Sequence, residues 1–297
     1  MSNARTSALT QPAKLSAFIA LTKPDVSFLV LMTTGAGFYM GARGPMPWLH
    51  MLHVIFGTLM IAAGTAALNH YIERESDRSM RRTASRPLPT GQLTPAEARR
   101  FGLALALGGA VDLYFTAGYI ACLLGVFTSI SYLLAYTPLK RRTVWATFIG
   151  AIPGAIPPMI GWTAATGKLD TGAWLLFAIL FVWQFPHFHA ISWMYREDYA
   201  RAGILMLPVI DKDGSRTFRQ IILYSASLVA VSLLPAIMGF AGVLYFFGAL
   251  VTCTGLVQVC LWAASAKTNT RAKWLMHATV LHIPILLGLM MYDKLPR

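Results

Sequence analysis

The sequence predicts an all-α, polytopic membrane protein: a bundle of nine transmembrane helices with the N-terminus inside and the C-terminus outside. Of its 297 residues, 56% are hydrophobic and 12% are charged, whereas a typical soluble domain has about 25% charged residues. Repeated apolar runs reach the length of roughly 20 residues that crosses a bilayer. The lysine and arginine residues, in addition, gather in alternate loops.

Nine apolar runs are expected to cross the membrane, with bounds that are soft by several residues. The third and fourth nearly touch, and Gly118 is expected to divide them. Alternation of apolar and polar residues is largely absent, which argues against the strands of an outer-membrane barrel. The runs are Val26–Ala42, Trp48–Tyr71, Ala98–Phe115, Tyr119–Tyr136, Trp145–Trp162, Ala173–Tyr195, Ile221–Phe240, Val243–Ser265 and Trp274–Tyr292.

The basic residues test this count independently, because lysine and arginine in short loops mark the cytoplasmic face. With nine crossings, the N-terminus and alternate loops share one side, and that side carries most of the basic residues. The net charge of +13 mostly reflects this asymmetry, so no nucleic-acid partner is expected. The opposite side carries only Arg43, Lys168, Lys294 and Arg297.

The chain is expected to form one intramembrane domain over residues 14–297, after a disordered cytoplasmic tail at 1–13. The first residues are polar and precede no short apolar region with a small-residue cleavage site, so we expect no cleavable signal peptide. Cys122, Cys253 and Cys260 lie inside apolar runs and are expected to pack as small apolar residues. Thr94 and Glu97 form the pattern of a capping box.

The end of the second apolar run carries the pattern most indicative of chemistry. Asn69, Glu73 and Asp77 recur every four residues, and on an α-helix each such step turns only about 40° and rises about 6 Å. One helix face therefore presents three oxygen ligands of the kind that Mg²⁺ binds together with phosphate. Arginine pairs well with phosphate, and Arg81, Arg82 and Arg86 follow within ten residues of Asp77.

Each of these polar groups also has a simpler interpretation. Asn69, Glu73 and Asp77 would singly suit a solvated helix end, but three on one face at the membrane boundary favour function, because buried charges in membranes are costly. The run Lys140–Arg142 is explained equally well by membrane topology and by binding of the diphosphate as it leaves. Asp198 is either a second metal-binding acid or the ion-pair partner of Arg201 or Arg196.

The sixth apolar run carries aromatic and histidine residues around a proline, from Trp183 to His189. Pro186 is expected to kink the helix, as are Pro153, Pro157 and Pro158 in the fifth run, so the two helices are expected to border a cavity. His187 and His189 are two residues apart, about 200° around a helix, and should face different ways. A buried, hydrogen-bonded structural role remains open for either histidine.

At these residues the chain resembles the UbiA superfamily of intramembrane prenyltransferases, and most of all its branch of protohaem IX farnesyltransferases, the haem O synthases. The resemblance extends over nearly the whole chain, from Leu21-Thr22-Lys23-Pro24 onwards. One departure is that Met194 and Ala202 flank Asp198 at four-residue spacing, where many relatives have further aspartates. The segments that carry the resemblance are Asn69–Asp77, Arg81–Gly91, Tyr136–Arg141, His187–Ala190 and Asp198–Pro208.

The resemblance implies transfer of a farnesyl group from farnesyl diphosphate to a vinyl group of protohaem IX, in a bacterial inner membrane, with Mg²⁺ as the cofactor. It implies that Asn69, Glu73, Asp77 and Asp198 hold the metal and act in catalysis with Lys140. Association with a downstream haem-modifying enzyme is a further expectation. The diphosphate-binding set is then Arg81, Arg82, Arg86, Lys140 and Arg141, and the haem-binding set is His187, His189, Arg196 and Arg201.

Two other functions remain open from the sequence. A prenyltransferase for an aromatic or quinone precursor would share the diphosphate site and differ in its acceptor pocket. A transporter would place charges near the midplane of a repeated bundle, whereas here the acids cluster at one face and only Asp112 suits that function.

Overall fold

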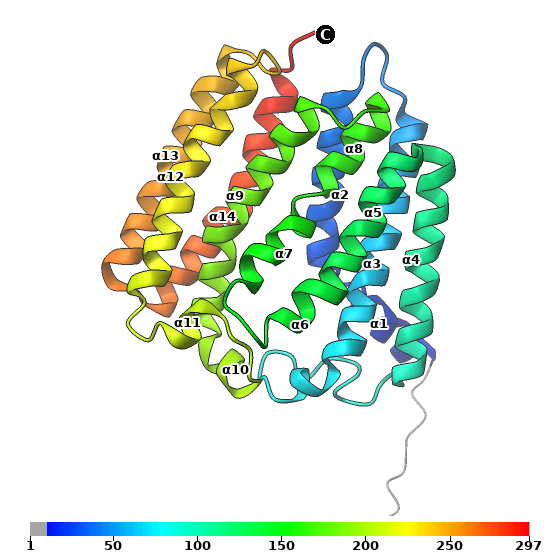
Figure 1. Ribbon diagram of the computed structural model, residues 1–297, viewed down its shortest axis with the longest axis vertical. Coiled ribbons are helices and arrows are strands. Elements are labelled where there is room, and N and C mark those ends of the chain that lie inside the picture. Colours follow the sequence, from blue (N-terminus) through cyan, green and yellow to red (C-terminus); the bar gives the residue numbers. More distant parts are fainter. Residues whose placement is uncertain (1–10, 297) are drawn as a thin grey trace, which may run out of the picture.

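The structure, a computed structural model, describes residues 11–296, which form a bundle of helices around one large apolar core (Figure 1). Within this range the β-structure is limited to a single bridge between Ala241 and Lys294. The elements are α1 (Gln11–Leu21), α2 (Pro24–Gly41), α3 (Trp48–Arg78), α4 (Pro95–Ala117), α5 (Tyr119–Ile130), the π-helix η1 (Ser131–Tyr136), α6 (Thr137–Leu139), α7 (Ala146–Gly154), α8 (Pro157–Thr166), α9 (Thr171–Met194), α10 (Arg196–Arg201), α11 (Leu207–Ile210), α12 (Ser215–Ile237), α13 (Val243–Ala266) and α14 (Asn269–Tyr292).

The all-helical, multi-pass prediction is confirmed. Among the described residues, seven helical segments are long and apolar enough to cross a membrane, or eight if α1 and α2 count as one bent span. The α4 helix has 23 residues but falls outside that set. The predicted number of nine spans and the orientation of the termini therefore stay predictions. Most of the predicted tail lies outside the described residues, and α1 begins at Gln11.

Two glycine contacts explain why α4 lies against α3 along most of its length (Figure 1). A Cβ atom at Gly64 would lie 2.5 Å from the backbone nitrogen of Ala106, and one at Gly109 would lie 2.6 Å from the carbonyl oxygen of Gly57. Small residues at such positions let two membrane helices approach closely. The predicted break at Gly118 is confirmed, since this residue separates α4 from α5 with φ of 86°.

The fifth predicted span is broken at its prolines, as expected. Its two halves, α7 and α8, are separated by Ala155 and Ile156, directly before Pro157 and Pro158. Proline has no backbone N–H for the helical ladder. The Gln184 side chain of α9 donates to the carbonyl oxygen of Ala151 at 3.0 Å, so α9 supplies a donor to the broken span.

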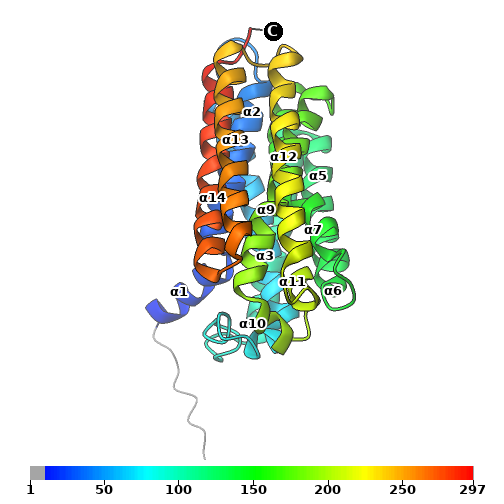
Figure 2. The same ribbon diagram turned by 90° about the vertical axis from the view of Figure 1, so that its left-hand side faces the viewer.

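The short elements gather at one end of the bundle, which we call the α10 end. There α1, α6, α10 and α11 and the loop after α3 lie together, whereas the chain ends at the other end (Figures 1 and 2). Met80 from the loop after α3 packs with Ile204 and Met206 from the segment after α10. The predicted capping box is confirmed, because Thr94 Oγ1 accepts from the Glu97 amide at 3.2 Å and the Glu97 carboxylate accepts in return. The α10 end is thus a packed layer rather than a set of free loops.

Candidate active site

The oxygen-bearing face of α3 lies at the α10 end and is buried. The helix runs two turns beyond the predicted Tyr71, so Asn69, Glu73 and Asp77 all belong to one continuous helix, as predicted. Asn69 and Asp77 are 1% and 0% exposed, and the Glu73 side chain is 12% exposed. Buried carboxylates need partners or a metal ion.

Each of these three side chains has a cationic partner, and each partner comes from a different segment. Lys140 Nζ lies 2.5 Å from Glu73 Oε1. An Arg86 guanidinium nitrogen donates to both carboxylate oxygens of Asp77, at 2.9 and 2.8 Å. Lys23 Nζ donates to Asn69 Oδ1 at 3.1 Å. Three cations from the α1–α2 junction, the loop after α3 and the α6 region therefore converge on one helix face.

Lys140 is held in place by contacts on several sides. Its ammonium lies 4.9 Å from the centre of the Tyr136 ring, and its carbonyl oxygen accepts from the Leu205 amide at 2.6 Å. Burial alone would lower the pKa of Lys140, but the neighbouring Tyr136 and Glu73 hold this pKa above its ordinary value. The ammonium therefore stays charged and is oriented before any ligand arrives.

The π-helix η1 connects the membrane-crossing part of α5 to this site. Asn69 Nδ2 donates to Thr137 Oγ1 at 3.2 Å, and Thr137 Oγ1 donates to the Tyr132 carbonyl oxygen at 2.9 Å. Single π-turns inside α-helical segments frequently mark functional sites. Here Thr137, the residue directly after the π-helix, accepts the hydrogen bond from the Asn69 amide at the start of the acidic face.

Asp198, from α10, is joined to the same region through the backbone. One of its oxygens accepts from the Arg82 amide at 3.1 Å, and the other pairs with Arg201. The ion pair is therefore with Arg201, while Arg196 donates to Asn269 Oδ1 and to the Trp193 carbonyl oxygen, both at 2.7 Å. Asp198 thus lies against the loop after the acidic face and has a cationic partner of its own.

The structure does not bring every predicted cation to the acids. Arg81 and Arg141 are exposed, and neither makes a side-chain hydrogen bond or ion pair within the described residues. The Arg82 guanidinium lies 5.1 Å from the centre of the Tyr195 ring. Glu75 pairs with Arg78 at 3.1 Å on the exposed side of α3, away from the acidic face.

The two histidines of α9 face different ways, as their spacing predicts. His187 Nδ1 lies 2.9 Å from Thr279 Oγ1 of α14, and its ring stacks on Trp183. His189 is 2% exposed. Neither of its ring nitrogens makes a hydrogen bond of normal geometry within the described residues, although the Gln220 side chain is close. The hydrogen-bonded structural role thus applies to His187.

Sequence reasoning missed three residues at this site. Lys23 had no role beyond its place where the resemblance begins, although it precedes a proline and has a left-handed φ of 49°. Thr137 had no role beyond its place in a motif. His70 is 2% exposed, and neither ring nitrogen has a hydrogen-bond partner in the described part of the chain. The sequence signals for these residues were a lysine shortly before the first apolar run and a histidine beside Asn69.

The donor set fits Mg²⁺ held jointly with phosphate better than a metal held by protein alone. Within residues 11–296 no group of three or more histidine, cysteine, aspartate or glutamate side chains is placed to hold a metal ion. Mg²⁺ is usually bound by one or two carboxylates, with phosphate and water completing its coordination. Glu73 and Asp77 meet that requirement, and the nearby cations suit the phosphate.

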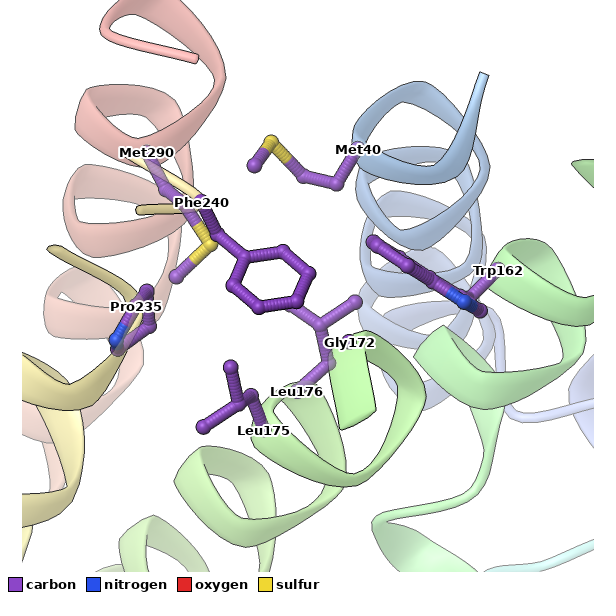
Figure 3. A pocket seen from close by; sticks show the side chains of 8 residues that line it. All are labelled: Met40, Trp162, Gly172, Leu175, Leu176, Pro235, Phe240 and Met290. Atoms are coloured by element: carbon purple, nitrogen blue, oxygen red, sulfur yellow. The ribbon is translucent and has the colours of Figure 1, made fainter. Parts of the chain in front are cut away.

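The opposite end of the bundle has a different kind of cavity. A small gap there is lined by Met40, Trp162, Phe240 and Met290, together with neighbouring aliphatic residues from α9 and α12 (Figure 3). No acid or base lines it. The chemistry of the described residues is therefore concentrated at the α10 end.

Comparison with known proteins gives relatives along nearly the whole chain. The model of the UbiA prenyltransferase family matches residues 30–282. A protein of Solibacter usitatus named protoheme IX farnesyltransferase is 48% identical over 286 residues, which are 93% of this chain and 98% of that protein. A protein of Koribacter versatilis with the same name is 44% identical over 284 residues, 92% of each chain.

Solved structures show the same fold at lower identity. A structure of a digeranylgeranylglyceryl phosphate synthase superposes with a TM-score of 0.77 at 19% identity, covering 94% of this chain and 98% of that one. A UbiA homologue from Archaeoglobus fulgidus, bound to GPP and Mg²⁺, superposes with a TM-score of 0.62 at 16% identity, covering 92% and 99%.

Proposed function

Because the chain belongs to the UbiA prenyltransferase family, we propose that it transfers a farnesyl group from farnesyl diphosphate to a vinyl group of protohaem IX, giving haem O. The names of the relatives support this acceptor. The observation that carries the proposal is the pairing of Glu73 and Asp77 with Lys140 and Arg86 in one buried site. Such a site has the charges of both signs that a metal–diphosphate complex needs.

The first chemical step breaks the bond between the farnesyl carbon and the diphosphate oxygen. The bonding electrons leave with the diphosphate, and Lys140, Arg86 and Lys23 stabilise the negative charge that develops on it. Bound at Glu73 and Asp77, a Mg²⁺ ion would supply further positive charge to the same oxygens. The buried cations are held by existing contacts, so little reorganisation is needed during the reaction.

The second step joins the farnesyl cation to the acceptor. The vinyl group of protohaem supplies an electron pair to the farnesyl carbon, and water adds to the resulting cation with release of one proton. The product is a hydroxyalkyl farnesyl side chain. Aromatic residues of α9 give this region an apolar wall, in which Phe181 and Phe185 contact edge to face. The wall keeps water away from the first cation until the acceptor captures it.

For the acceptor we propose that α9 and the α10 segment hold protohaem. His189 is buried without a hydrogen bond of normal geometry in the described residues, and the bond from His187 to Thr279 uses only one ring nitrogen. Either imidazole is a suitable iron ligand, and we favour His187 because it directly follows Pro186. Arg196 and Arg201 supply positive charge for the propionates.

We further propose that the α10 end faces the cytoplasm, with nine crossings and the C-terminus outside, in a bacterial inner membrane. Reporter fusions at Gly91, Arg142 and Thr268 should then read cytoplasmic, and fusions after Gly167 and Arg297 should read external. A cytoplasmic reporter at the C-terminus would contradict nine crossings. Association with a downstream haem-modifying enzyme is part of the same proposal, since the apolar product must pass between membrane proteins.

The test is the product. The chain is expressed in a host that lacks this activity, and extracted haems are analysed by mass spectrometry. We expect haem O with the native chain and with Glu75→Gln, and none with Glu73→Gln, which removes a charge from the same helix. A prenylated aromatic or quinone precursor instead of haem O would assign the other acceptor class. Absence of any diphosphate release would contradict prenyl transfer itself.

A further inference from the structure

The outer faces of α13 and α14 form a groove that the catalytic site does not use. The two helices lie side by side on the outside of the bundle (Figure 2). The groove has a volume of about 630 Å³ and is lined by Gln258 and Trp262 from α13 and by Trp274, His277 and Leu281 from α14. This volume is within the range of small-molecule sites, about 300–1,000 Å³. Trp262 and Trp274 are 44% and 62% exposed.

Two polar side chains in this groove lie at a depth where a hydrogen-bond partner is needed. Gln258 lies eight residues before the end of α13, and His277 lies eight residues after the start of α14, which places both about 12 Å from the helix ends. Both are exposed on the membrane-facing side of candidate spans. Neither has a hydrogen bond within the described part of the chain. Unsatisfied polar groups in hydrocarbon cost several kcal/mol.

Ordinary explanations do not cover this pair. Tryptophans near helix ends belong to the usual aromatic belt, but glutamine and histidine do not. Lysine and arginine extend their charged ends to the headgroups, whereas the side chains of Gln258 and His277 are too short to span about 12 Å. The pair therefore points to a ligand that enters the groove.

The rim of the groove at the α10 end is basic. The Arg271 guanidinium lies 4.7 Å from the centre of the Trp262 ring and donates to Ser265 Oγ at 2.6 Å, so it is fixed over the groove wall. Lys273 is exposed directly before Trp274. A ligand that uses every feature needs anionic groups at the rim, a flat apolar body between the indoles and an atom that binds imidazole.

We propose that the groove binds an iron porphyrin, with its propionates on Arg271 and Lys273 and its iron within reach of His277. A phospholipid would satisfy the rim and the apolar walls but offers no atom that binds the His277 imidazole, which the iron of a porphyrin does. This inference rests on the proposed function, because it takes the same acceptor class. The groove is a second binding site, which the porphyrin occupies before or after the reaction.

The position of the groove relative to α9 suits a second binding site. Thr279, which contacts His187 of α9, is fully buried. His277 is two residues earlier, about 200° around α14, and is exposed. The groove and the proposed acceptor region therefore lie on opposite sides of the same helix.

The test uses the full chain in phospholipid nanodiscs, with protohaem as the probe. Haem is titrated while the absorption spectrum and the number of haems bound are recorded for the native chain, His277→Leu, Gln258→Leu and the control Val280→Leu. Leucine suits the membrane-facing position, so the variants should fold. We expect each groove variant to bind one haem fewer and His277→Leu to lose an imidazole-ligated band. Turnover at saturating haem should be unchanged, while the haem concentration for half-maximal rate rises roughly tenfold.

An unchanged spectrum and haem count in both groove variants would overturn the proposal while haem O formation continued. If the native chain made no haem O but its haem spectrum depended on His277, the groove would stand and the proposed function would fall. Native mass spectrometry gives two further outcomes against it. If both groove variants lost a bound phospholipid, or a bound second copy of the chain, without any change in haem count, the groove would be assigned to that occupant.

Discussion

Charged residues at the two ends of the bundle are used in different ways. At the α10 end, Glu73 and Asp77 pair with the side chains of Lys140 and Arg86. At the opposite end, Asp293 accepts from the Tyr245 amide at 2.7 Å, and Lys294 donates to the carbonyl oxygens of Tyr39 and Ala42, both at 2.6 Å. Side-chain pairs can open to admit a charged ligand, whereas charges bound to backbone fasten the chain. The charges at the α10 end therefore suit a ligand site, whereas the charges at the opposite end hold the chain in place.

The largest expected effect is loss of turnover on removing a charge from the acidic face of α3. Glu73→Gln and Asp77→Asn keep the side-chain shape and lose the carboxylate charge, so each should lower turnover roughly 100-fold or more. Glu75→Gln removes the same charge from the exposed side and should leave turnover near normal. Diphosphate release at limiting Mg²⁺ is the measurement, and equal rates in all three variants would show that the acidic face of α3 has no special role in turnover.

A second effect concerns stability at the same end. Lys140→Met leaves Glu73 buried without its partner, which typically costs about 3–5 kcal/mol. The free energy of unfolding in mixed micelles should therefore fall. Adding Glu73→Gln should recover most of that loss while turnover stays low. If the double variant were no more stable than Lys140→Met, the pair would not be the source of the loss.

At the opposite end the same kind of change should affect stability alone. Lys294→Met removes hydrogen bonds to two carbonyl oxygens and should lower the free energy of unfolding by about 2 kcal/mol. Turnover per folded molecule should stay within about twofold of the native rate, because no reacting group depends on this lysine. A loss of turnover comparable with that of Glu73→Gln would show that the ends are not functionally distinct.

The smallest effect is a pH dependence at the start of α4. The Glu97 carboxylate accepts hydrogen bonds from Lys14 and Thr94, which lower the pKa of Glu97 to about 2 from the ordinary 4.5. Its stabilisation is therefore fully present above pH 4.5 and is lost as the pH falls through 2. Glu97→Gln keeps a capping hydrogen bond but loses the charge that pairs with Lys14, so it should cost up to about 1 kcal/mol at neutral pH, and the difference from the native chain should shrink below pH 4.5. A pH-independent difference would contradict the ionised cap.

The sequence predicts those features that depend on near neighbours. The acidic face results from four-residue spacing on one helix, and the breaks at Gly118 and Pro157 result from local backbone chemistry. By contrast, Lys23 and Lys140 lie 46 and 67 residues from Asn69 and Glu73. Their approach depends on how whole helices pack, which no local pattern encodes. The choice between Arg196 and Arg201 as the partner of Asp198 is instead local: Arg201 is three residues along α10 and lies on the same helix face as Asp198.

The π-helix η1 has a consequence for how this site is aligned. A π-turn contains one residue more than the α-helical path it replaces, and each residue rotates the next part of the helix by about 100°. Lys140 comes four residues after η1 ends at Tyr136. The extra residue therefore sets the rotational phase of Lys140 against Glu73. Membrane-facing side chains of α5 and Lys140 can therefore take independent rotational positions along one continuous helical segment. A single-residue deletion within 131–136 would bring both into one register and turn Lys140 away from Glu73.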